Sequence, residues 1–188
     1  MKTTLLALAA ALASLLPMGC SSVSSPFVVG EPIKEDLSSK VNGIWKVGDA
    51  VYYAKQVRNG ELRVATTEWT SDTFRLVATT VLLTEYQGGM YINYLSPEPP
   101  KDKPEYFFAR CGFADDGSLV AYGPVAEVFA QGVGKKELQG EINRSEHTVN
   151  VKITGGKESF LKFIQNDKVA EQFTLSQPLI VHRIVEQK

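Results

Sequence analysis

Cysteine and histidine are scarce in this chain, which restricts the chemistry it can perform. Its 188 residues include two cysteines, Cys20 and Cys111, and two histidines, His147 and His182. Neither histidine has a suitably spaced histidine, cysteine or acidic residue that would complete a metal site. We therefore expect no bound metal and no other cofactor. With two cysteines, at most one disulfide can form within the chain.

Recognisable catalytic motifs are absent as well. The sequence contains no G-x-S-x-G motif, no glycine-rich phosphate-binding loop and no H-E-x-x-H motif. Neither sign of charge dominates, since 20 Lys and Arg residues stand against 21 Asp and Glu residues and no charge run exceeds three. A chain without a charged tract has little electrostatic basis for binding a polyanion. We therefore expect a protein that is not an enzyme and does not bind nucleic acid.

One apolar run stands near the start of the chain, and it is too short to span a membrane. Residues 5–16 (LLALAAALASLL) contain one polar residue, Ser14. As a helix this run would be about 18 Å long, against about 30 Å for a bilayer core. With Lys2 before the run and small residues after it, residues 1–19 are typical of a secretory signal peptide. The alternative, a buried helix of the mature fold, is disfavoured because the run has no polar face.

The residues at the end of this leader indicate how the mature chain is held. The pair Gly19-Cys20 resembles the lipobox of bacterial lipoproteins, in which a glycine or alanine precedes an invariant cysteine. That family usually has leucine three residues before the cysteine, where this chain has Pro17. The resemblance implies that Cys20 becomes the N-terminus and carries a thioether-linked diacylglycerol, with fatty-acyl chains such as palmitate in the membrane. The alternative is a secreted protein with a disulfide between Cys20 and Cys111.

The same resemblance implies a location in the cell envelope. In Gram-negative lipoproteins, an aspartate directly after the cysteine commonly means retention at the inner membrane. This chain has Ser21 there, so for a Gram-negative source we expect anchoring in the outer membrane, facing the periplasm. Each buried acyl CH₂ contributes about 0.8 kcal/mol, so the two or three chains of this class should anchor stably where one binds only marginally.

The rest of the chain divides into a linker and one domain. Residues 20–40 are rich in serine and proline and have no sustained period, which predicts a flexible tether with an r.m.s. span of about 25 Å. Alternatively, residues 26–30 (PFVVG) attach to the domain as an edge strand. Residues 41–188 are sufficient for a single globular domain.

Alternation of apolar and polar residues predicts a mainly β domain of about eight strands, mostly antiparallel. Asn59-Gly60 separates the first two strands and predicts a type I′ turn with positive φ at both residues. The alternation changes phase near Val77, which predicts a bulge or bend there. Helical spacing of apolar residues predicts short helices near residues 124–133 and 157–166. The predicted strands are residues 49–57, 62–70, 73–86, 90–95, 106–113, 119–123, 148–154 and 178–185.

Eight antiparallel strands can close into a barrel, which removes exposed edges, or pack as a sandwich. Gly43-Ile44-Trp45 resembles the G-x-W pattern that opens the first strand of lipocalins. The resemblance implies a lipocalin-like barrel in which an arginine of the last strand packs on the tryptophan. Arg183 is the candidate for that arginine.

Three functions are compatible with this sequence. The first is a non-enzymatic, membrane-anchored lipoprotein that interacts with another envelope protein, and it is the one we expect. The alternative is a lipocalin-like carrier of a small apolar ligand, and a third is an enzyme that uses scattered residues. A cavity of about 300 Å³ or more with a few inward polar groups would favour the carrier. A filled barrel with an exposed apolar patch would favour the interaction module.

Overall fold

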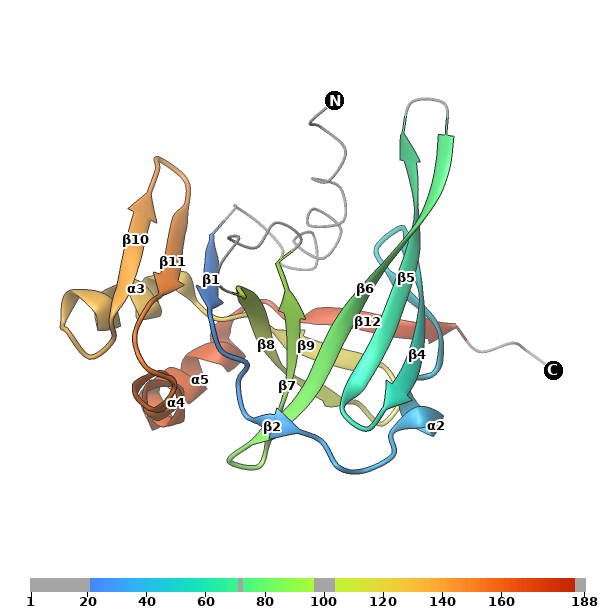
Figure 1. The fold of residues 1–188 in the computed structure, drawn as a ribbon, viewed down its shortest axis with the longest axis horizontal. Coiled ribbons are helices and arrows are strands. Elements are labelled where there is room, and N and C mark those ends of the chain that lie inside the picture. Colours follow the sequence, from blue (N-terminus) through green and yellow to red (C-terminus); the bar gives the residue numbers. More distant parts are fainter. Residues whose placement is uncertain (1–20, 71–72, 97–103, 185–188) are drawn as a thin grey trace.

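The computed structural model describes residues 21–70, 73–96 and 104–184. Eight strands form a closed antiparallel barrel in the centre and right of Figure 1. The barrel strands are β3 (Gly43–Val47), β4 (Ala50–Arg58), β5 (Glu61–Thr70), β6 (Thr73–Tyr86), β7 (Gly89–Leu95), β8 (Tyr106–Phe113), β9 (Leu119–Tyr122) and β12 (Leu179–Ile184).

The last strand closes the barrel. β12 pairs with β3, where Arg183 lies opposite Trp45, and with β9, where Leu179 lies opposite Ala121. β9 pairs in turn with β8, so each barrel strand has a neighbour on both sides. A mainly β fold with a lipocalin-like barrel is thus confirmed, and the strands do not form the alternative sandwich.

The first hairpin turn differs in detail from its prediction. Asn59 and Gly60 join β4 to β5 as expected, and Gly60 has a φ of +72°. Asn59 does not have positive φ, and the register shifts between Gln56 and Arg58. The type I′ prediction is therefore wrong. A single left-handed glycine accompanied by a bulge is the other common way to close a short hairpin.

Of the bulge or bend predicted near Val77, the bulge is wrong. β5 and β6 pair without a register shift from Glu61–Leu82 to Thr70–Thr73. The phase change has another cause: the outer half of β6 leaves the barrel, and β7 pairs with β6 only from Val81 onward. Beyond that point no core selects one face of the strand, so the apolar residues need not keep a single alternation.

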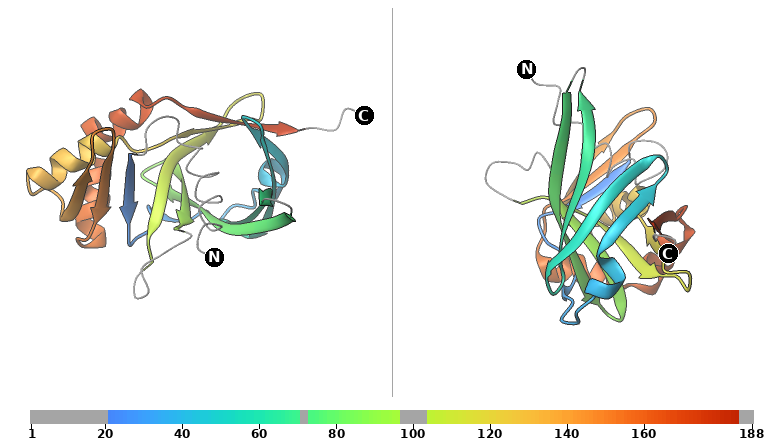
Figure 2. Two further views of the ribbon diagram at one scale, coloured as in Figure 1. Left: turned by 90° about the horizontal axis from the view of Figure 1, so that it is seen from above. Right: turned by 90° about the vertical axis from the view of Figure 1, so that its right-hand side faces the viewer.

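A second, smaller sheet branches from the barrel at β8. One edge of β8 pairs first with β1 (Ser22–Ser25) and further along with β9. β1 runs parallel to β11 (Val149–Ile153), and β11 pairs with β10 (Gly140–Arg144), an unpredicted strand. Figure 2 shows this sheet beside the barrel, with helices against it.

Three helices cover the small sheet. α3 (Ala126–Gly134) and α4 (Lys157–Gln165) confirm the two predicted helices. α5 (Asp167–Leu175) was not predicted; it follows α4 directly, and the side chain of Asn166 caps it by accepting a hydrogen bond from the Lys168 backbone N–H at 3.1 Å.

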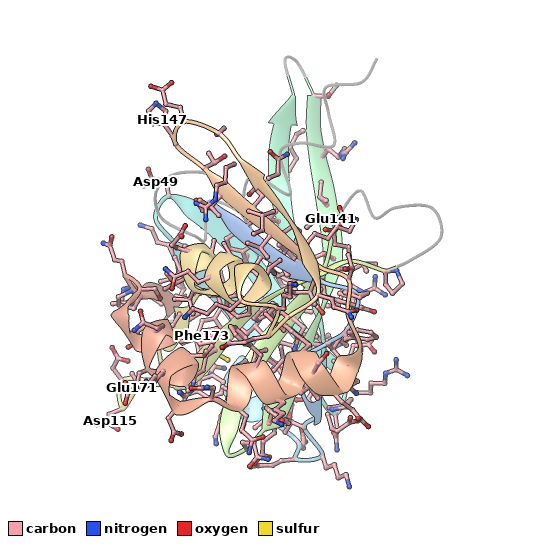
Figure 3. All side chains as sticks on the ribbon, turned by 90° about the vertical axis from the view of Figure 1, so that its left-hand side faces the viewer. Asp49, Asp115, Glu141, His147, Glu171 and Phe173 are labelled. Carbon is pink, nitrogen blue, oxygen red and sulfur yellow. The ribbon has the colours of Figure 1, made fainter. Side chains whose placement is uncertain are left out.

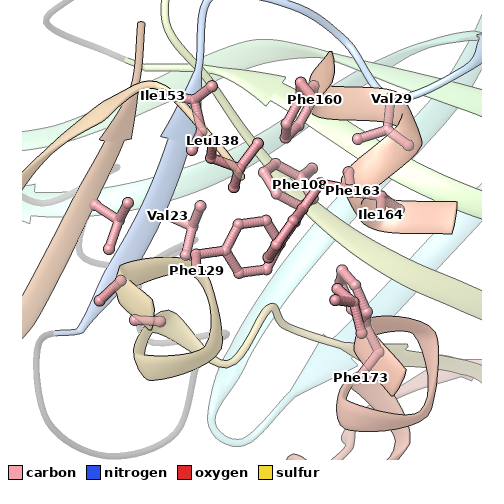
Figure 4. Packing of buried hydrophobic residues seen from close by; sticks show 14 of the residues in the cluster. Val23, Val29, Phe108, Phe129, Leu138, Ile153, Phe160, Phe163, Ile164 and Phe173 are labelled. Carbon is pink, nitrogen blue, oxygen red and sulfur yellow. The ribbon is translucent and has the colours of Figure 1, made fainter. Parts of the chain in front are cut away.

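These helices enclose what we call the aromatic core: Phe108, Phe129, Phe160, Phe163 and Phe173. The ring of Phe108, on the outer face of β8, lies 5.9 Å from Phe129 and 5.5 Å from Phe160 between centroids. Phe173 meets Phe129 edge-on at 6.4 Å. The rings are almost fully buried, and Figure 4 shows how residues from the barrel, the small sheet and all three helices converge on them.

Residues 21–40 are packed on the domain, in place of the flexible tether that their composition predicted. β1 is mostly buried between β8 and β11. Val29 is fully buried; its N–H donates to Asn93 Oδ1 at 2.8 Å, and its carbonyl accepts from the Thr84 hydroxyl. The PFVVG segment is therefore held on the barrel, although the strands assigned here are β1 and β2 (Glu31–Pro32), which flank it.

Candidate functional site

The barrel interior contains a partly open cavity of about 140 Å³ with apolar walls. This volume is well below the roughly 300 Å³ at which ligand pockets for drug-sized molecules begin. A dry apolar cavity of about this size can still hold a benzene-sized molecule. The lining includes Val64, Val81, Ile92, Tyr94, Leu119 and Val181.

One end of the barrel is closed by α2 (Ser38–Val41), whose Val41 is buried beside the preceding Leu37. The indole of Trp45 donates to the Val41 carbonyl at 2.8 Å. The guanidinium of Arg183 donates to the carbonyl oxygens of Ser39 at 3.0 Å and Asn42 at 2.7 Å. The expected placement of Arg183 beside Trp45 on a neighbouring strand is confirmed. Stacking of the guanidinium on the indole stays a prediction.

Three buried groups on the barrel strands, Tyr52, Tyr94 and Cys111, are held in their neutral forms. Burial raises the pKa of Tyr94 and of Cys111 far above the ordinary values, and it also raises the pKa of Tyr52. Cys111 is a free thiol between Met90 and Ala121 on the neighbouring strands. A buried, protonated thiol is a poor nucleophile, so Cys111 acts here as a small apolar side chain.

A second cavity, of about 290 Å³, lies where one edge of β8 changes its pairing partner from β1 to β9. We call this place the fork. Its lining combines polar residues at the start of β1 with apolar residues such as Phe107 and Val125. Glu127, also in the lining, accepts two hydrogen bonds from Arg144 at 2.8 and 3.0 Å. These hydrogen bonds lower the pKa of the Glu127 carboxyl.

The outer face of the barrel, away from the helices, carries an exposed apolar row. The row crosses five strands and follows the strand register. Its members are Ile184, Ile44, Tyr53, Ala65 and Ala78. Ile184, Ile44 and Tyr53 are 45%, 43% and 54% exposed, although they are large apolar side chains.

Cationic residues flank this apolar row on both sides. The row on one side consists of His182, Lys46 and Val51, which lie opposite one another on β12, β3 and β4. The row on the other side contains Lys55 of β4, which lies opposite Arg63 of β5. All these side chains are exposed, and the described residues of the three rows include no carboxylate. We call these three rows the outer wall.

The other residues considered from the sequence are placed as follows. The leader and Cys20 lie outside the described residues, and the described chain begins next to them at Ser21. His147 lies in the β10–β11 turn and His182 in β12, so they belong to separate elements. Within the described residues, no three His, Cys, Asp or Glu side chains gather as a metal site. No helix in this part of the chain is long and apolar enough to cross a membrane.

The outer wall was not predicted from the sequence, although β4 contains a signal for it. Residues 51–54 (VYYA) are apolar at four consecutive positions, whereas a strand with one solvated face alternates. Tyr52 and Ala54 fill the barrel, and Val51 and Tyr53 are exposed outside it. The barrel core accounts for Tyr52 and Ala54 but not for the exposed apolar side chains of Val51 and Tyr53.

Comparison with protein-family models, curated proteins and solved structures gave no match.

Proposed function

We propose that this chain is a membrane-anchored envelope lipoprotein without enzymatic activity, which binds another envelope protein through the outer wall. In this proposal Cys20 carries the lipid, and the domain faces the periplasm from the outer membrane. The observation that carries the binding role is the exposed apolar row around Ile44 and Tyr53. Contiguous exposed apolar surface on a monomeric protein commonly marks an interaction site.

The charges of the outer wall define the chemistry of this partner. Lys46, Lys55 and Arg63 border the apolar row without a carboxylate among the described residues of the three rows. A complementary surface has an apolar centre with acidic residues at its rim, because opposite potentials steer encounter and exclude wrong partners. We therefore propose an envelope protein with an apolar, acid-rimmed face as the partner.

The surroundings of Cys111 support lipidation of Cys20 over the disulfide alternative. Cys111 is buried, and both neighbouring strand positions are occupied, by Met90 and Ala121. A disulfide requires Cα atoms within about 7 Å and Cβ atoms that point at each other. The enclosed position of Cys111 disfavours that approach.

The binding role is tested by placing a photoactivatable amino acid at Tyr53 in living cells. Illumination should join Tyr53 to one defined protein, and the purified pair should bind in a salt-dependent way. Reversing the wall charges with Lys46→Glu, Lys55→Glu and Arg63→Glu should weaken that binding at least about tenfold. The matched control places the photoactivatable residue at Lys162, an exposed residue of α4. Equal cross-linking from Lys162, or joining of Tyr53 to a second copy of this chain, would contradict the proposal.

The anchor is tested separately by Cys20→Ser. This substitution should abolish labelling with radioactive palmitate and release the processed protein into the soluble periplasmic fraction. A Cys20→Ser chain that has lost its leader and still sediments with membranes would show that lipid on Cys20 is not the anchor.

The barrel cavity favours a second candidate function, the binding of a small apolar molecule. Its walls are apolar and its volume of about 140 Å³ suits a molecule of benzene size. Titration of the purified domain with benzene, followed by calorimetry, tests this. Saturable binding that Ala109→Leu abolishes would support a carrier, because Ala109 lines the cavity. Absence of saturable binding would remove this candidate.

A further inference from the structure

We propose that two copies of this chain associate through the exposed edge of β10, where each β10 strand pairs antiparallel with its copy about a two-fold axis at Ile142. The two small sheets then become one continuous sheet. This inference depends neither on lipid at Cys20 nor on the outer wall, so it is independent of the proposed function.

β10 (Gly140–Arg144) is the last strand at one end of the sheet, and among the described residues it pairs only with β11. Figure 1 shows β10 at the margin of the small sheet, and Figure 3 looks onto this side of the molecule, with Glu141 labelled. Residues 141–144 are all exposed. The N–H and C=O groups along such an edge are a template for pairing with another strand.

The hydrogen bonds between β10 and β11 determine which backbone groups of β10 face outward. At one end of the pair, the Ser145 N–H donates to the Thr148 carbonyl at 2.9 Å. At the other end, the Thr154 N–H donates to the Gln139 carbonyl at 2.9 Å. Opposite residues of an antiparallel ladder alternate between hydrogen-bonded and non-hydrogen-bonded pairs. The residues whose N–H and C=O groups point away from β11 are therefore Gly140, Ile142 and Arg144.

These outward-facing residues match their own copies. When Ile142 lies on the two-fold axis, it faces Ile142 of the second copy, and Gly140 faces Arg144 of the second copy on each side. Every outward-facing residue thus meets another one, and each such pair exchanges two hydrogen bonds. A two-fold contact uses the same patch on both copies, so β10 supplies both halves of the interface.

The side chains of β10 are compatible with this register. Ile142 is 38% exposed and meets its own copy, which covers apolar surface on both chains. Glu141 faces Asn143 of the second copy, and the Asn143 amide is a hydrogen-bond donor that suits the Glu141 carboxylate. No like charges lie directly opposite one another. The sequence of β10 therefore favours a second copy of this chain as the occupant of its edge.

Arg144 fits this register because its guanidinium is already held within its own copy. It donates to the two carboxylate oxygens of Glu127 at 2.8 and 3.0 Å. The residue that faces Arg144 across the interface is Gly140, which has no side chain to displace this ion pair. The strands of the outer wall, β12, β3, β4 and β5, lie toward the other end of the strand order from β10. The dimer therefore leaves the outer wall free.

A cysteine at the proposed axis tests the contact directly. In a hydrogen-bonded antiparallel pair the Cα atoms are about 5.5 Å apart, which is within the range that a disulfide spans. Ile142→Cys should therefore form a covalent dimer when the full-length protein is mildly oxidised in intact cells. The matched control is Ile180→Cys, because Ile180 is a 45% exposed isoleucine of the barrel strand β12. The control should remain monomeric.

Sedimentation of the purified Cys20→Ser chain measures the association without acyl chains that could themselves drive it. Ile142→Pro should convert the dimer to a monomer, because proline removes an N–H that pairs with the second copy. The ladder with β11 keeps its hydrogen bonds, since this N–H points outward, where an edge strand tolerates proline. Ile142→Lys is a second variant that places like charges directly opposite one another at the axis. Circular dichroism verifies that both variants remain folded.

Substitutions of Asn143 test the register. Asn143→Lys places a lysine opposite Glu141 in both halves of the dimer, whereas Asn143→Asp places a second carboxylate there. From the contribution of cross-strand charge pairs, the dissociation constant should fall by about two- to thirtyfold for Asn143→Lys and rise by a similar factor for Asn143→Asp. Equal dissociation constants for the two variants would overturn the two-fold register.

Two further outcomes would overturn the proposal. One is a Cys20→Ser chain that sediments as a monomer together with an Ile142→Cys chain that forms no more covalent dimer than Ile180→Cys. The other is a folded Ile142→Pro or Ile142→Lys chain that still dimerises, because the dimer would then use another surface. Loss of lipid at Cys20 or of binding at the outer wall would leave these measurements unchanged, so failure of the proposed function is distinguishable from failure of this inference.

Discussion

The barrel interior and the aromatic core are both apolar, but they are packed in different ways. The aromatic core joins Phe108, Phe129 and Phe173 at ring distances of 5.9–6.4 Å, and Phe163 lies 5.3 Å from Phe129. The barrel interior is built mostly from aliphatic residues and retains a cavity of about 140 Å³. The difference shows that the helices and the small sheet form the tightly packed core. The barrel strands instead separate an incompletely filled interior from the exposed outer wall.

Truncation of a buried side chain should reduce the free energy of unfolding much more in the aromatic core than in the barrel. Phe129→Ala should destabilise the domain by about 3–5 kcal/mol, because its ring is almost fully buried among other aromatic rings. Val64→Ala in the barrel should cost about 1 kcal/mol, because Val64 already borders a cavity. Urea unfolding measures both. Equal losses would show that the barrel is packed as tightly as the aromatic core.

A substitution at the closed end of the barrel should cost more stability than one in the β8–β9 turn. A Cβ at Gly60 would lie 2.9 Å from the Ile33 backbone nitrogen and from the Leu83 carbonyl oxygen. Gly117 also has positive φ, but nothing lies within 4 Å of its Cβ position. Gly60→Ala should therefore cost about 2–4 kcal/mol, and Gly117→Ala about 1–2 kcal/mol from backbone strain alone. Melting midpoints that fall equally would contradict this account of the closed end.

Added volume should have opposite consequences in the two regions. Ala130 is almost fully buried in the aromatic core region, and Ala130→Leu should cost about 1–3 kcal/mol by overpacking. Ala109 borders the barrel cavity, and Ala109→Leu should change stability by less than about 1 kcal/mol. Chemical denaturation compares the pair. A large loss from Ala109→Leu would show that the cavity cannot accept a side chain.

The smallest effect concerns Glu127 at the fork between the two regions. Its pKa is lowered by the hydrogen bonds from Arg144, so Arg144→Gln should raise the Glu127 pKa toward its ordinary value in an NMR titration. A lowered folded-state pKa stabilises the fold above the unfolded-state pKa, and this contribution is lost as pH falls through the folded-state pKa. Because the pair is exposed, the unfolding midpoint at neutral pH should scarcely change. An unchanged Glu127 pKa would show that Arg144 is not the cause of the shift.

Most barrel strands were predictable from sequence because each has one face in the barrel core. Runs of β-forming residues, together with the Asn59-Gly60 turn, located strands such as β4 and β8 to within a residue or two. β10 was missed because its residues are mostly exposed and show no alternation. The prediction of a linker over residues 21–40 failed because serines, which predict a linker by composition, are buried in β1 here, and Ser24 donates a partly buried hydrogen bond to Glu105.

The candidate surfaces were less predictable than the fold. The outer wall depends on register between strands, which brings Ile184, Ile44 and Tyr53 into one row from distant parts of the sequence. The cavity depends on side-chain volumes that only the packed barrel reveals. The fork at β8 depends on a parallel pairing between residues 22–24 and 150–152, for which the sequence contains no local signal.

The photo-cross-link at Tyr53 in two altered chains tests the central claim, that the outer wall rather than the barrel interior is the functional face. One chain has the cavity filled by Ala109→Leu, and the other has the wall reversed by Lys46→Glu, Lys55→Glu and Arg63→Glu. We expect the cross-link to persist in the filled barrel and to disappear from the reversed wall. A cross-link that survives charge reversal but is lost when the cavity is filled would contradict the account and assign the function to the barrel interior.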